Sequence, residues 1–153
     1  MNAAQDAAMV SQPPSPPLAD AAEAFAAIAV AAVACDGELA SLEARELRQQ
    51  LEYRRPYRDA GPEAMIALLD RLLHLLRKQG WRELVAQAAP LLSGEQRETA
   101  LALACQLTQA DHVESSVEQG FLDGLGQQLA IAAERASQIR EVIAVLNRDS
   151  LAG

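Results

Sequence analysis

A short acidic motif occurs twice in this chain, each time just after an apolar run rich in alanine and leucine. The first copy begins at Asp36 and has Glu43 seven residues later, and the second begins at Asp111 and has Glu118 seven residues later. Both acids are offset by the same 75 residues. Such a duplication limits the chain to folds in which two similar units contribute equivalent carboxylates, and it points to one shared site.

Residues around the acids repeat on the same offset. Leu42 corresponds to Val117, and Leu47 corresponds to Leu122. The repeated unit is therefore a helix, an acidic loop and a second helix. If two such hairpins pack about a pseudo-twofold axis, their loops meet and the four carboxylates converge. This arrangement is an inference from the symmetry of the sequence.

The composition favours helix over sheet. Alanine and leucine dominate, β-branched residues are sparse and aromatic residues make up 3% of the chain. No segment alternates with the strand period over a useful length. We expect an all-α fold, a compact bundle of about seven helices built from two pseudo-symmetric helix–acidic loop–helix halves. The expected helices span approximately residues 20–35, 41–55, 62–79, 81–89, 93–110, 115–129 and 132–146.

Local signals place the helix ends. Asp20 is a candidate N-cap, Gly37 suits the left-handed conformation after a helix, and Pro62 suits a first helical position. Ser93 to Gln96 and Ser115 to Glu118 both read as capping boxes. Apolar residues at helical spacing define the expected inner faces. For the second and last helices these are Leu42, Leu47, Leu51, Ile139, Val142, Ile143 and Leu146.

Charge and hydropathy exclude several classes of function. Residues 1–17 form a Pro-rich tail expected to be disordered, and residues 18–153 form one helical domain. The net charge of −8 disfavours nucleic-acid binding. The longest apolar run, residues 24–35, is too short to span a bilayer, and the N-terminus lacks a secretory signal.

Cys35 and Cys105 are expected to be reduced, which suits a cytoplasmic location, with a disulfide between them as the alternative.

The acidic motifs allow a structural and a functional interpretation. Structurally, Glu118 completes a capping box, and Glu43 lies in the first turn of a helix, where the helix dipole favours acids. Functionally, converging carboxylates repel one another unless a cation joins them, and oxygen ligands suit hard ions such as Ca²⁺ or Mg²⁺. Arginines between residues 54 and 58 could neutralise the acids instead. The EF-hand spacing is absent.

The paired motifs resemble those of the TerB family, the tellurite-resistance protein B domain. The resemblance covers about residues 20–131 and rests on Ala34-Cys35-Asp36-Gly37 with Glu43, and on Ala110-Asp111 with Glu118 and Phe121-Leu122. The second copy departs from the family pattern, with His112 in place of the usual glycine. The resemblance implies a helical bundle of two halves, in a bacterial cytoplasmic protein linked to tellurite resistance and stress. It also implies an acidic site for a divalent metal, with Asp36, Glu43, Asp111 and Glu118 as ligands.

The sequence therefore predicts a TerB-like binding or sensing module that is not an enzyme and that holds a divalent cation, Ca²⁺ or Mg²⁺ in preference. The alternative is a protein–protein interaction module in which the acids are structural. In either case we expect a protein partner, whose identity the sequence leaves open along with the oligomeric state. A third alternative, hydrolysis by a metal-activated water, lacks a separate general base in the sequence.

Overall fold

The computed structural model describes residues 16–109 and 116–153, and within these ranges all regular secondary structure is helical, without strands. This confirms the predicted all-α bundle of about seven helices. The α-helices are α2 (Ala21–Val33), α3 (Ser41–Glu52), α4 (Pro62–Gln79), α5 (Trp81–Ala88), α6 (Gly94–Gln109), α7 (Ser116–Gln128) and α8 (Ala133–Leu146). Two short 3-10 helices, η1 (Tyr57–Asp59) and η2 (Ala89–Leu91), lie between them. The predicted disordered tail falls almost wholly outside the described residues.

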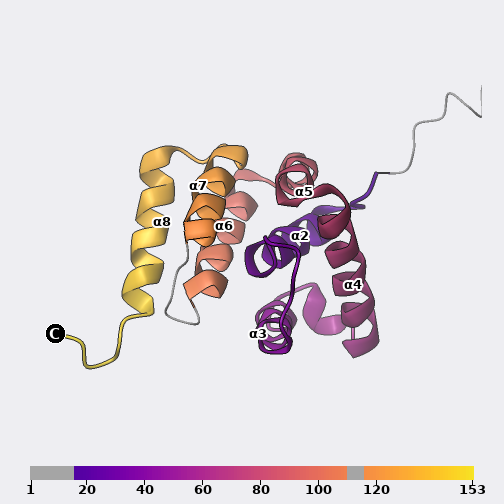
Figure 1. Ribbon diagram of the computed structural model, residues 1–153, viewed down its shortest axis with the longest axis horizontal. Helices are drawn as coiled ribbons and strands as arrows, with labels where there is room; N and C mark the ends of the chain where they lie inside the picture. Colours follow the sequence, from indigo (N-terminus) through magenta and orange to yellow (C-terminus); the bar gives the residue numbers. More distant parts are fainter. Residues whose placement is uncertain (1–15, 110–115) are drawn as a thin grey trace, which may run out of the picture.

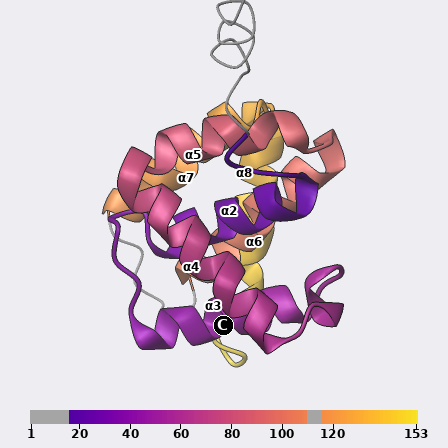
Figure 2. The same cartoon turned by 90° about the vertical axis from the view of Figure 1, so that its right-hand side faces the viewer.

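Helix α2 lies in the middle of the molecule, and the other helices surround it (Figures 1 and 2). It packs most extensively against α6 and α5 and also contacts α4 and α3. Helix α8 packs on α6 and α7 at the opposite side from α4 (Figure 1). The two repeated units, α2–α3 and α6–α7, therefore meet through their first helices.

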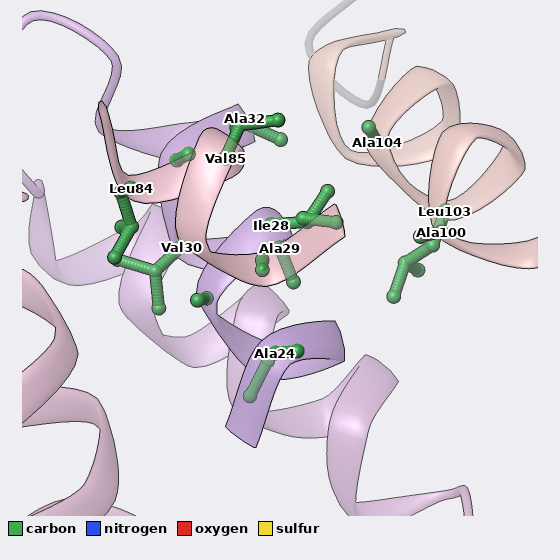
Figure 3. Close-up of a cluster of buried hydrophobic side chains, with 14 of the residues drawn as sticks. Ala24, Ile28, Ala29, Val30, Ala32, Leu84, Val85, Ala100, Leu103 and Ala104 are labelled. Atoms are coloured by element: carbon green, nitrogen blue, oxygen red, sulfur yellow. The ribbon is translucent and has the colours of Figure 1, made fainter. Parts of the chain in front are cut away.

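The alanine content of α2 explains its central place. Eight of its thirteen residues are buried, most of them alanines, and these small side chains let neighbouring helices approach closely. Figure 3 shows Val30 of α2 beside Leu84 of α5, and Leu103 of α6 on the far side of Ile28. All four of these side chains are buried. Packing on several faces makes α2 the helix about which the core is built.

Local chemistry accounts for the helix ends. The Asp20 carboxylate accepts a hydrogen bond from the Glu23 amide at 2.9 Å and caps α2, as predicted. Pro62 occupies the first turn of α4. At α6 the Ser93 amide donates to the Gln96 side chain at 2.8 Å, and the Gln96 amide donates to the Ser93 hydroxyl at 3.2 Å. This reciprocal pair is the predicted capping box. Ser115, of the second predicted box, lies outside the described residues.

The predicted inner faces of two helices are only partly correct. In α3, Leu47 and Leu51 are buried, but Leu42 is 73% exposed. Leu42 lies on the first turn of α3, before the helix reaches the core. Its helical spacing alone therefore does not predict whether it is buried. In α8, Ile139 and Ile143 pack against the core, whereas Val142 and Leu146 face solvent. That helix carries more apolar residues than its neighbours can cover.

Cys35 and Cys105 form no disulfide bond in the structure; Cys105 is buried and Cys35 is half-buried. Among the described residues, no helix combines the length and the apolar character needed to cross a membrane.

Candidate functional site

An open cleft of about 590 Å³ lies between the two repeated units. Asp36 and Glu43 line it from the first unit, Glu118 lines it from the second, and Arg77 reaches it from α4. A smaller hollow of about 330 Å³ continues it and shares Glu43 and Glu118. We call the two together the acidic cleft. Described carboxylates of both repeated units therefore line one surface.

The first acidic loop has a defined turn. The Asp36 carboxylate accepts a hydrogen bond from the Glu38 amide at 3.0 Å, which is the geometry of an Asx turn. Gly37 has a φ of +89°, a backbone region that disfavours other residues, and its amide donates to the Ala34 carbonyl at 2.7 Å. One oxygen of Asp36 is thus engaged in holding its own loop.

Arg77 fixes this loop to α4. Its Nε donates to the Gly37 carbonyl at 2.8 Å. The arginines predicted as partners of the acids lie elsewhere, because Arg54 and Arg55 line a different pocket with Phe25. Arg77 is the cationic side chain that sequence reasoning missed. Its place in the last turn of α4 makes it look like a simple helix C-terminal residue.

The environment of Cys35 shows how close the two units are. Burial raises the pKa of the Cys35 thiol, and the negative charges of Asp36 and then Glu118 raise it further. A carboxylate from each unit therefore lies within electrostatic range of the same sulfur. Because its pKa is raised, the thiol is protonated at neutral pH and is not activated as a nucleophile.

Exposed apolar side chains border the acids. Leu42 precedes Glu43, and Val117 precedes Glu118. Both line the acidic cleft, and Leu42 is 73% and Val117 60% exposed. The two residues are equivalent positions of the duplication. Each unit thus presents the same pair, one apolar side chain and one carboxylate, to the cleft.

The structure describes three of the four predicted metal ligands. Asp36, Glu43 and Glu118 line the acidic cleft together, whereas Asp111 lies outside the described residues. Within the part of the chain that the structure describes, no three His, Cys, Asp or Glu side chains gather closely enough to hold a metal ion. The described carboxylates therefore line the cleft, but they do not form a coordination shell.

Comparisons of the chain with models of known protein families, with curated proteins and with solved structures found no match. The resemblance to the TerB family therefore rests on the sequence motifs themselves and stays a prediction.

Proposed function

We propose that this chain is a non-catalytic interaction module whose acidic cleft docks a basic, amphipathic segment of a partner protein. The observation that carries the proposal is the repeated pair of an exposed apolar residue and a carboxylate, Leu42 with Glu43 and Val117 with Glu118, on one cleft. An exposed apolar group beside a charge suits a surface that a partner covers.

The two kinds of side chain would play different roles in docking. Covering Leu42 and Val117 removes apolar surface from water, which contributes about 1–2 kcal/mol for each side chain. The carboxylates would attract lysine or arginine side chains and select the orientation of the partner more than they add to its affinity. Arg77 leaves the cleft acidic, because among the described residues that line it five carboxylates accompany this one cation.

Synthetic helical peptides test this proposal. A lysine–leucine amphipathic peptide should bind, measured by isothermal titration calorimetry, and a glutamate–leucine peptide of the same pattern should not. The double change Glu43→Gln and Glu118→Gln should weaken binding about tenfold, because two charge contacts are lost. Leu42→Ser should weaken it about fivefold through the lost apolar contact.

Matched controls come from the same chain. Glu63 is an exposed acid at the start of α4, about 21 Å along that helix from Arg77 at 1.5 Å per residue. Leu151 is 93% exposed near the C-terminus. Glu63→Gln and Leu151→Ser should leave peptide affinity unchanged. Equal binding of the basic and acidic peptides, or equal effects of the control changes, would exclude docking at the acidic cleft.

A second candidate is the TerB-like role, in which the cleft holds Ca²⁺ or Mg²⁺ as part of a bacterial stress response. Its support is that Asp36, Glu43 and Glu118 line one cleft and supply oxygen donors of the kind that hard cations prefer. The described carboxylates do not form a coordination group by themselves. An ion would therefore need a further ligand, for which Asp111 is the candidate from the sequence.

Thermal unfolding with added cations tests the second candidate. A bound ion stabilises only the folded chain, so an ion at a hundredfold excess over its dissociation constant should raise the melting temperature by about 5–10 °C. The double change Asp36→Ala and Asp111→Ala should abolish this shift, while Glu63→Gln should preserve it. A shift that survives in the double variant would rule out these acids as ligands.

A further inference from the structure

A second pocket, separate from the acidic cleft, lies where the first turns of α2 and α6 meet the segment between α3 and η1. Its volume is about 410 Å³, within the range of small-molecule sites. Phe25 lines it from α2, Arg54 and Arg55 line it from the connecting segment, and Leu92 closes it beside α6. None of its lining residues is shared with the acidic cleft.

Arg54 is held in place at this pocket with a donor unused. Its guanidinium carbon lies 5.9 Å from the centre of the Phe25 ring, a cation–π contact. Its Nε is buried and, among the described residues, has no hydrogen-bond acceptor. Because Nε is inaccessible from the pocket, the contact with Phe25 holds the side chain in place, and a ligand would meet the outer nitrogens of the guanidinium.

The charges around the pocket favour a ligand that carries one negative charge. Arg54 and Arg55 face one lining carboxylate, Glu95. The first turn of α6 adds the positive end of a helix dipole, whereas that of α2 is already capped by the Asp20 carboxylate. Asp20 lies within electrostatic range of Tyr57 on the pocket wall, and the Tyr57 hydroxyl donates to the Ala22 carbonyl. Among the side chains that line the pocket, the two arginines outnumber the carboxylates by one, and Asp20 lies outside that lining.

We propose that this pocket binds a small organic monocarboxylate, with its carboxylate on Arg54 and Arg55 and its apolar body against Phe25 and Leu92. The planar guanidinium groups match a carboxylate geometrically. A dianionic phosphate suits the pocket less well, because Glu95 would repel its second charge. The apolar walls give a ligand body a surface that a bare inorganic anion cannot use.

Four probes of matched size or charge test the assignment. Phenylbutyrate should bind with a dissociation constant of about 1 mM or lower, followed by the amide shifts of Phe25, Arg55 and Thr99 in ¹H–¹⁵N NMR spectra. Phenylbutylamine, phenylbutyramide and inorganic phosphate should each bind at least about tenfold more weakly, because each lacks either the charge or the apolar body. Equal binding of the amine or the neutral amide would overturn the arginine contact, and tighter binding of phosphate would overturn the monocarboxylate assignment.

Variants of the connecting segment provide a matched comparison. Arg55→Gln removes an exposed arginine of the pocket, and it should weaken phenylbutyrate binding about tenfold. Arg54→Gln should weaken it further. Arg58 lies in η1, just after this segment, is half exposed beside Asp59 and does not line the pocket, so Arg58→Gln should leave binding unchanged. Circular dichroism confirms that each variant is folded. Binding that Arg55→Gln leaves intact, or that Arg58→Gln weakens equally, would refute the proposal.

Discussion

Replacing Arg97 with methionine should lower the free energy of unfolding by about 3 kcal/mol, because the side chain of Arg97 binds three backbone carbonyls at once. Its Nη2 donates to the Ala89 carbonyl at 2.7 Å, its Nε donates to the Leu92 carbonyl at 3.2 Å, and its Nη1 donates to the Leu129 carbonyl at 3.2 Å. Methionine fills much of the same space but leaves these acceptors without their donor. Urea denaturation followed by circular dichroism measures the change.

Arg135 is the matched control for this experiment. It makes an exposed ion pair with Glu98, with a distance of 3.0 Å between its Nε and the carboxylate. Surface pairs of this kind contribute little to stability, so Arg135→Met should hardly move the denaturation midpoint. Arg97→Lys should lie between the wild type and Arg97→Met, because lysine keeps the charge without the forked geometry. Equal effects of the two methionine variants would show that the carbonyl contacts of Arg97 do not stabilise the fold.

Replacing Gly124 with alanine should lower the free energy of unfolding by about 2 kcal/mol, because the new methyl group would overpack the core. A Cβ atom at Gly124 would lie 2.7 Å from Cη2 of Trp81. The indole cannot easily yield. Its centre lies 4.7 Å from that of the Phe121 ring, and the Arg82 guanidinium covers it at 4.5 Å.

Gly120 lies one turn earlier in α7, and its replacement with alanine should change the free energy of unfolding in the opposite direction. A Cβ atom there meets nothing within 4 Å. Gly120→Ala should therefore raise the free energy of unfolding by about 1 kcal/mol, since alanine favours the helix over glycine. Denaturation curves monitored by the fluorescence of Trp81, the single tryptophan, measure both variants. A stabilising effect of Gly124→Ala would show that the indole moves aside at little cost.

The helix ends could be predicted because their causes are local. Asp20, Pro62 and the Ser93–Gln96 pair each act within a few residues along the chain, so the sequence contains all the partners. Contacts between distant segments carry no such signal. Gly120 and Gly124 look alike in sequence, and only the packing of Trp81 distinguishes them.

The candidate site could likewise be predicted only in part. The duplication predicts that four carboxylates converge; Asp36, Glu43 and Glu118 line one cleft, and Asp111 lies outside the described residues. The role of Arg77 depends on its hydrogen bond to the Gly37 carbonyl, 40 residues away, and no local sequence pattern predicts that contact. The exposure of Leu42 likewise depends on how far the core extends along α3, which its helical spacing does not reveal.

The burial of α2 among later helices has a consequence for synthesis of the chain. α2 leaves the ribosome before its partners α5 and α6 exist, and although α3 and α4 are made earlier, the faces that α5 and α6 cover cannot be buried until those helices arrive. Helix α6 begins about 60 residues later, which corresponds to about 3–12 s of translation at common rates. During that interval the faces of this alanine-rich segment that α5 and α6 later cover stay unshielded. The central element of the finished protein is thus the one most in need of protection while it is being made.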